Sequence, residues 1–133
     1  MIDIENEVYT RIATRLRQEF PNIFVTGETN LNPSRFPCAF IEEADNSALT
    51  TTRDTASNEN HVVVMYEANV FSNLQVGKKS EAKSIFAVVD DEFDKLGFTR
   101  QAKVPIPMDE GTKYRIVGRW TAVARKDSTI FRR

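Results

Sequence analysis

The chain is poor in the residues that most metal and redox sites use, because it contains one cysteine, Cys38, and one histidine, His61. A disulfide within the chain and a Cys/His zinc site are therefore excluded by number alone. No run approaches the roughly 20 apolar residues that cross a bilayer, and the first residues have neither the basic nor the apolar region of a secretory signal. We expect a protein that is made and used without secretion and has no membrane partner.

Neither of these two residues stands in a catalytic pattern. His61 opens an alternating apolar segment without a nucleophile elbow or a similar signature beside it, and Cys38 follows Pro37 in another apolar segment. An ordinary strand-end residue and a small buried residue are the simpler interpretations. The Gly-Lys-Lys-Ser run at 77–80 does not complete a phosphate-binding loop, because Ser72 stands where the first glycine is required and Lys79 where Ser or Thr is required. The sequence therefore predicts no enzyme, no cofactor and no metal site.

The overall composition is that of one globular domain with a core. The 133 residues are 41% hydrophobic and 28% charged. Residues 1–60 contain 10 acidic and 5 basic residues, whereas residues 61–133 contain 9 acidic and 13 basic residues. Such unequal halves suit head-to-tail contact between copies, and a solvated surface with chance asymmetry is the alternative.

Apolar periodicity predicts two helices. Residues 3–20 have an apolar side chain at every fourth position, with Asp3 as a cap and Pro21 as a stop. Residues 79–96 have apolar side chains at spacings of three and four, and Gly97 followed by Phe98 indicates a left-handed helix ending.

Alternating apolar and polar residues predict the strands, at 23–26, 38–43, 60–71, 100–104 and 112–125. The first two should form a hairpin-like pair with a broad connection, and the polar stretch 45–60 should be a mobile loop. The predicted fold is α+β, a mainly antiparallel mixed β-sheet of about five strands with two α-helices packed on one face. It would form a single domain at 1–126, followed by a C-terminal arm at 127–133.

An acidic cluster lies in the second predicted helix, at Asp90, Asp91, Glu92 and Asp94. A weak magnesium contact is one interpretation. A solvated helix face with Asp91 near Lys95 is the preferred one, since all-oxygen metal sites usually collect ligands from separate elements or loops.

The last 21 residues are basic, with seven basic residues and one acidic residue at 113–133. On a strand, Tyr114 and Trp120 would share one face, so these aromatic rings are better placed in a core than as base-stacking platforms. The other face would carry Arg115, Arg119 and Arg125. A nucleic-acid-binding module using this stripe is an alternative, but the net charge of −1 favours a protein neighbour.

Four segments in combination carry a family resemblance. They are YEANVFSN at 66–73, GKKSEAK at 77–83, LGFTR at 96–100 and YRIVGRW at 114–120. The series resembles the small tail-terminator, or tail-completion, proteins of long-tailed bacteriophages and prophages, often labelled minor capsid proteins. The likeness covers roughly residues 60–126, and Trp120 stands where the family is expected to have a tyrosine.

The resemblance implies a structural virion protein of the tail or neck region that is assembled in the host cytoplasm. Six copies would form a homohexameric ring that caps the tail tube, halts its growth and joins it to the head-completion, or connector, proteins. DNA would pass through the lumen of the ring without being read. A tail-tube subunit, or another neck or head-completion subunit, is the alternative within the same particle.

We expect contacts between subunits or between rings in the loop 45–60, on the basic strand face and in the terminal arm. The residues chosen for this role are Arg53, Asp54, Lys78, Lys79, Arg115, Arg119, Arg125, Phe131, Arg132 and Arg133.

Overall fold

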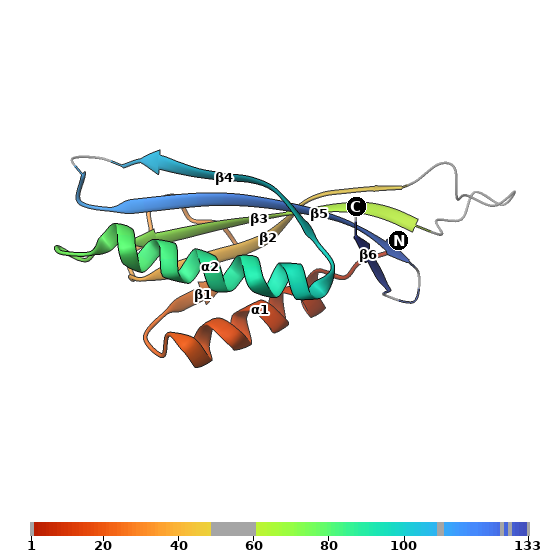
Figure 1. The fold of residues 1–133 in the computed structure, drawn as a ribbon, viewed down its shortest axis with the longest axis horizontal. Coiled ribbons are helices and arrows are strands. Elements are labelled where there is room, and N and C mark those ends of the chain that lie inside the picture. Colours follow the sequence, from red (N-terminus) through yellow and green to blue (C-terminus); the bar gives the residue numbers. More distant parts are fainter. Residues whose placement is uncertain (1, 49–60, 109–110, 126, 128, 133) are drawn as a thin grey trace, which may run out of the picture.

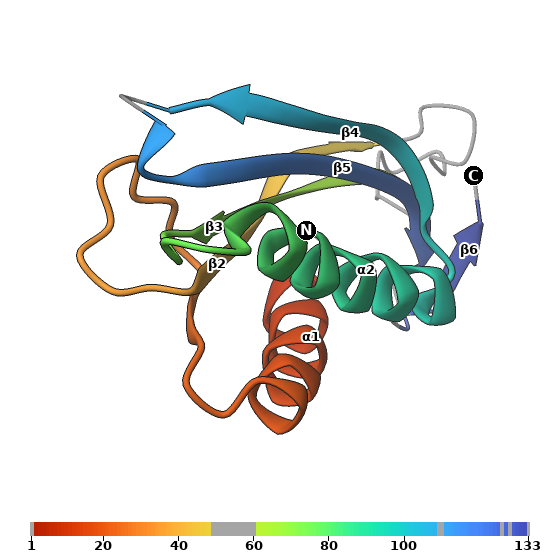
Figure 2. The ribbon, with the colours of Figure 1, turned by 60° about the vertical axis from the view of Figure 1, so that its left-hand side comes forward.

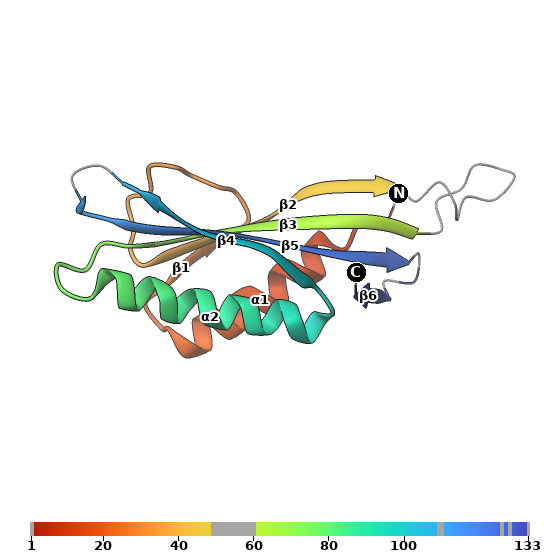
Figure 3. The same cartoon turned by 45° about the horizontal axis from the view of Figure 1, so that its top comes forward.

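The computed structural model describes residues 2–48, 61–108, 111–125, 127 and 129–132, and it shows two helices on one face of a six-stranded sheet (Figures 1 and 3). The elements in chain order are α1 (Glu5–Glu19), β1 (Phe24–Thr26), β2 (Cys38–Ala48), β3 (His61–Ser72), α2 (Lys78–Leu96), β4 (Thr99–Pro107), β5 (Tyr114–Arg125) and β6 (Ile130–Arg132). The predicted α+β class, with both helices on one face, is confirmed. No helix in this part of the chain is long and apolar enough to cross a bilayer.

The sheet is built around two long central strands. Its order is β1-β2-β3-β5-β4, and β6 pairs with the end of β5 that β4 leaves free. Strands β3 and β5 pair over their full length, from His61 opposite Arg125 to Ser72 opposite Tyr114. Every pairing is antiparallel except that of β1 with β2.

Both helices begin and end close to the predicted positions. In α1, Val8, Ile12 and Leu16 are buried at the predicted spacing of four, so one face of the helix packs on the sheet. Asp3 was predicted as the cap of α1, but the N-cap residue is Ile4, which makes no side-chain cap hydrogen bond. Asp3 instead accepts a local hydrogen bond, since the Glu5 backbone N–H donates to its Oδ1 at 3.0 Å.

Glycines in the left-handed conformation bound α2 at both ends. Gly77 precedes the helix with φ 89°, and Gly97 follows it with φ 99°. The Phe98 N–H then donates to the Phe93 carbonyl at 2.9 Å, and Phe98 is buried. This is the predicted left-handed ending, which satisfies helix-terminal carbonyls and adds an apolar contact.

The main core lies between the helices and the sheet and is rich in aromatic rings. Trp120 of β5 stacks on Phe93 of α2, with centroids 4.4 Å apart and planes inclined by 16°. Its Nε1 donates to Asp90 Oδ1 at 2.9 Å. The backbone of Gly118 lies so close to the rings of Phe86 and Trp120 that a Cβ there would come within 2.6 Å of both. These contacts hold α2 against β5 in the middle of the sheet.

The prediction of a hairpin-like pair at 23–26 and 38–43 is wrong, because β1 and β2 run parallel. The 27–37 connection crosses to the helix-free side of the sheet at the end away from β6 (Figures 2 and 3). It is held there by a second, smaller core of buried side chains, namely Cys38, Phe40 and Phe71, against which Phe24 and Phe36 pack. A simple hairpin would leave the rings of Phe24 and Phe36 exposed to water.

Two polar segments that were expected outside the sheet are strands. β2 continues to Ala48, beyond a bulge between Glu43 and Asp45, so residues 45–48 are not part of a loop. Main-chain hydrogen bonds to β3 stabilise this extension of β2, although the extension has no large apolar side chains. The remainder of the predicted loop, 49–60, lies outside the described residues. In the segment expected to be an arm, Ile130–Arg132 forms β6 and Ile130 packs against the core.

Candidate assembly surfaces

The basic stripe of β5 lies on the helix-free face of the sheet, as predicted. The intervening residues Ile116, Gly118 and Trp120 are buried beneath the helices. Arg119 and Arg125 are about half exposed, with 53% and 49% of each side chain accessible. The predicted inward direction of Trp120 is confirmed, since the residue has no exposed surface.

Two arginines of the stripe are bound within the chain. Arg115 donates from Nε and Nη2 to Asn69 Oδ1 at 2.9 and 2.6 Å, and its guanidinium lies 5.5 Å from the ring centroid of Phe71. Arg119 donates to Glu67 Oε1 at 3.2 Å from the directly opposite position on β3. Because their charge-assisted bonds already have acceptors, these side chains are less available to phosphates or a neighbour.

The third arginine of the stripe belongs to a different surface, where β5 meets β6. Arg125 lies 5.9 Å from the ring centroid of Phe131 and 4.0 Å from Asp127 Oδ1. Phe131 is 41% exposed, and the ring centroid of His61 lies 6.2 Å from that of Phe131. Arg132 also lies in β6. The remaining candidates, Arg53, Asp54 and Arg133, lie outside the described residues.

The predicted lysines lie at the other end of the sheet. Lys78 and Lys79 open α2, and Figure 1 shows this turn and β6 at opposite ends of the molecule. Beside them a hollow of about 410 Å³ is lined by Asn73, Leu74, Gln75, Lys78, Gly111, Thr112 and Lys113. The structure therefore places the described candidate residues in three regions: the start of α2, the β5–β6 end of the sheet, and the stripe on β5 between them.

Two exposed apolar residues of this end were missed by the sequence reasoning. Leu74 is 44% exposed and Val76 is 90% exposed, both in the short connection between β3 and α2. Their signal in the sequence is weak, namely two apolar residues in an otherwise polar loop. An almost fully exposed valine gains nothing from folding of the isolated chain, so the two residues are candidates for contact with a partner.

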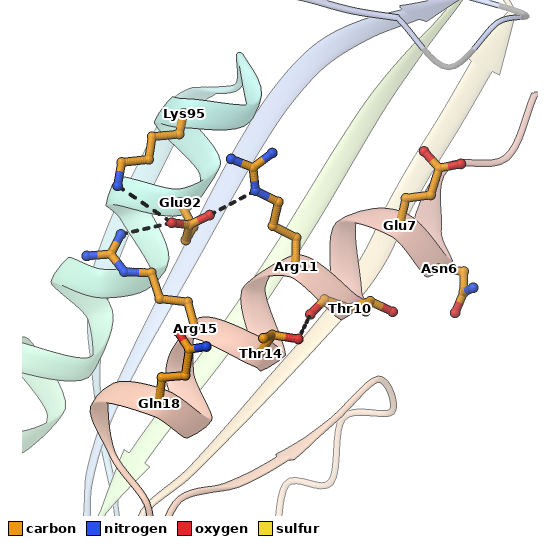
Figure 4. A pocket seen from close by; sticks show the side chains of 9 residues that line it. All are labelled: Asn6, Glu7, Thr10, Arg11, Thr14, Arg15, Gln18, Glu92 and Lys95. Carbon is orange, nitrogen blue, oxygen red and sulfur yellow. Dashed lines mark hydrogen bonds and ion pairs between the residues drawn. The ribbon is translucent and has the colours of Figure 1, made fainter.

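One member of the acidic cluster, Glu92, faces α1 and lines a groove of about 590 Å³ between the two helices (Figure 4). Glu92 is only 6% exposed and accepts from Arg11 Nε at 3.2 Å and from Arg15 Nη1 at 3.0 Å. Arg15 also binds Asp91, and the predicted Asp91–Lys95 pair is present at 3.2 Å. Hydrogen bonds from Arg15 and then Lys95 lower the pKa of Asp91.

These ion pairs decide between the two interpretations of the cluster. Asp90 is likewise engaged, since its Oδ2 accepts from Arg100 at 2.9 Å and its Oδ1 accepts from Trp120. With cations of the same chain on Asp90, Asp91 and Glu92, the cluster neutralises itself and the magnesium interpretation is not supported. The pairs also join Arg11 and Arg15 of the acidic half of the sequence to Asp91 and Glu92 of the basic half.

Cys38 is buried in β2, and His61 is partly buried at the start of β3. Cys38 has no exposed surface, and burial raises the pKa of its thiol to about 12 against an opposing effect of Lys113. The reactive thiolate is therefore absent near neutral pH. The Nδ1 atom of His61 is buried without a hydrogen-bond partner among the described residues.

The comparisons with known proteins return structural neighbours only. No protein-family model matches the chain, and no curated protein matches it. A chain from the virion of a native gene transfer agent particle superposes with a TM-score of 0.58 at 12% identity, covering 86% of this chain and 88% of that one. A second solved protein, whose name states no function, has a TM-score of 0.52 at 14% identity and covers 90% and 94%. At such identities the likeness shows a shared fold.

Proposed function

We propose that the protein is a structural subunit of a phage-like virion and, within it, the tail terminator whose ring caps the tail tube. The observation that carries the proposal is the fold likeness to a chain of a gene transfer agent virion, which covers most of both chains. Because the match covers 86% of this chain and 88% of that chain, the likeness concerns the whole of the compared unit and not a common submotif. The finer role rests on the sequence resemblance at 66–120.

The exposed side chains support an assembly role. A ring of identical subunits joined head to tail needs two different surfaces on each subunit. The two ends of the sheet meet this need, since one carries Leu74 and Val76 beside Lys78, and the other carries Phe131 beside Arg125. Fully burying a side chain such as Val, Leu or Phe contributes about 1.5–3 kcal/mol, so a contact at either end would gain from exclusion of water.

In the proposed particle the ring is a homohexamer that binds the tail-tube protein on one side and the head-completion or connector proteins on the other. DNA passes through the lumen without sequence readout. This role needs surfaces and a rigid body, and no reaction chemistry. The internal bonds of Arg115 and Arg119 weaken the nucleic-acid-binding alternative, because two of the three stripe arginines already have acceptors.

Electron microscopy of the purified protein, alone and mixed with tail tubes of the same particle, tests the proposal. A terminator gives single closed rings or a single cap at one end of each tube. A tail-tube subunit gives stacked rings of open length. Stacks, or salt-sensitive binding to duplex DNA at physiological ionic strength without any ring or cap, would contradict the terminator role.

A matched pair of variants locates the contact. Val76→Asp places a charge where the proposed interface buries an apolar side chain, and it should reduce ring or cap formation by at least about tenfold, which corresponds to about 1.4 kcal/mol. Gln75→Asp adds the same charge to the same exposed loop and should have little effect. Equal assembly of both variants would exclude this end of the sheet as a contact.

The loop 49–60 is tested by deletion. Ala48 pairs with Val62, so removal should start after Ala48 to spare the strand ladder. A chain lacking 49–57 should keep its far-ultraviolet circular dichroism and fail to join tails to heads. Normal infectious particles from that mutant would refute the role of the loop.

A further inference from the structure

Three carboxylates meet where α1 begins. Asp3 precedes the helix, Glu5 opens its first turn and Glu43 belongs to β2. One carboxylate oxygen from each lies within 4.8 Å of the other two. The backbone holds them there, since the Glu43 N–H donates to Glu5 Oε2 at 2.8 Å and the Glu5 N–H donates to Asp3 Oδ1 at 3.0 Å. The ligands thus come from two segments far apart in the sequence, residues 3–5 and β2, as all-oxygen cation sites commonly combine carboxylates of different parts of a chain.

The negative charge of this cluster is not neutralised by the part of the chain that the structure describes. No lysine or arginine in that part pairs with any of the three carboxylates. The Glu43 carboxylate accepts a hydrogen bond from the neutral side chain of Asn46, whose Nδ2 lies 3.1 Å from Glu43 Oε1. The cluster in α2 differs in this respect, because it has its own arginines and lysine.

A second and independent observation is the hydroxyl of Tyr66. This residue has no exposed surface, and its hydroxyl has no hydrogen-bond partner among the described residues. Tyr66 lies directly opposite Glu43 on the helix-covered face of the sheet. Directly opposite residues of antiparallel strands point to the same face with Cβ atoms about 4.5–5.5 Å apart, so the side chain of Tyr66 lies beside that of Glu43. A buried hydroxyl normally has a partner, in the protein or in ordered water.

We propose that Asp3, Glu5 and Glu43 bind one calcium ion, and that the Tyr66 hydroxyl donates a hydrogen bond to a water molecule of that ion. Ca²⁺–oxygen distances of about 2.3–2.6 Å allow ligand oxygens up to about 5 Å apart across the ion, whereas Mg²⁺–oxygen distances of about 2.0–2.1 Å allow only about 4.2 Å. The three oxygens, all within 4.8 Å of one another, can therefore reach one calcium ion, and calcium accepts irregular sets of carboxylate ligands whereas Mg²⁺ requires near-ideal octahedral geometry. The ion would join the start of α1 to β2.

Calorimetric titration of the chelator-treated full chain with CaCl₂, and separately with MgCl₂, tests the site. One saturable calcium site is expected, with magnesium at least tenfold weaker. In an amide-resolved NMR titration, the shifts should concentrate at residues 3–6 and 43–46. No saturable calcium binding at millimolar concentration, or shifts confined to another surface, would overturn the proposal.

Asp3→Asn is the decisive variant, because an asparagine still accepts the Glu5 N–H at the helix start while it removes the charge. It should weaken calcium binding at least tenfold, and Glu43→Gln should do the same if it folds. Glu19→Gln, an exposed carboxylate at the other end of α1, is the control and should bind like the wild type. Tyr66→Phe should weaken binding two- to fivefold. Unchanged affinity in Asp3→Asn would exclude the site, and unchanged affinity in Tyr66→Phe would exclude the hydroxyl from it.

Discussion

Replacing Gly118 by alanine should destabilise the fold at its most tightly packed point. The new Cβ would lie 2.5 Å from Trp120 Cη2 and 2.6 Å from Phe86 Cε2 and Cζ. Non-bonded carbon atoms pack at about 3.5–4.0 Å, so both rings must move by about 1 Å, or the backbone of β5 must shift. Trp120 is held by its stack on Phe93 and its bond to Asp90, and neither ring is the flexible end of a long side chain.

The size of the effect follows from two opposing contributions. Overpacking a well-filled core costs about 1–3 kcal/mol. The smaller conformational freedom of alanine in the unfolded chain offsets about 0.4–1 kcal/mol of that cost. We expect a net loss of about 1–2 kcal/mol in the free energy of unfolding.

Urea unfolding followed by far-ultraviolet circular dichroism and by the fluorescence of Trp120, the only tryptophan, measures this loss. Gly27→Ala is the control, since a Cβ at Gly27 would meet Tyr9 and Ile41 only at ordinary distances of 3.6 Å or more. It should be unchanged or up to about 1 kcal/mol more stable. A Gly118→Ala protein within about 0.5 kcal/mol of the wild type would refute the reasoning, because that range is typical of surface substitutions.

Three further outcomes follow from the buried and ion-paired groups. Cys38 should resist a water-soluble thiol reagent at pH 7 in the folded protein and react after unfolding; rapid reaction of the folded chain would contradict its burial and its raised pKa. Glu92→Ala should lower the free energy of unfolding by about 1–3 kcal/mol, because Arg11 and Arg15 lose a largely buried acceptor; an unchanged urea midpoint would contradict this. The pKa of Asp91 is lowered in the folded state, so its contribution is present above about pH 4 and is lost as the pH falls through the lowered value. Asp91→Asn should therefore be less stable than the wild type at pH 7 and equal to it near pH 2, and a constant difference across that range would contradict the pairing.

The helices and central strands were predictable because each has a local signal. A spacing of four in α1 and the Gly97–Phe98 ending of α2 are properties of a few consecutive residues, and tertiary packing preserved both. The direction of β1 was not predictable in this way. It depends on Phe24 and Phe36 packing on the helix-free face with Phe71, which is far away in the sequence. The polar end of β2 was missed for the related reason that main-chain pairing with β3 sustains it.

The candidate surfaces show the same division between local and distant causes. Alternation along β5 places Arg115, Arg119 and Arg125 on one face, as predicted, but says nothing about which of them is free. Arg115 donates to Asn69, which is 46 residues away along the chain, and Arg119 donates to Glu67, which is 52 residues away. Only the register of β3 against β5 brings these partners opposite the arginines, and no local pattern specifies that register.

Charge by itself is therefore a poor guide to where this chain makes contact with others. The fold supplies an amide acceptor for Arg115 and a carboxylate acceptor for Arg119, so two of the predicted cations are engaged within the chain. Val76 has no comparable partner among the described residues, because its side chain is 90% exposed and makes almost no contact that would explain an apolar residue at that position. The same reasoning applies in reverse to Asp3, Glu5 and Glu43, whose charges lack a described cation. Groups that folding leaves unsatisfied, whether apolar in water or anionic without a partner, are the ones from which assembly contacts and ligand sites should be sought first.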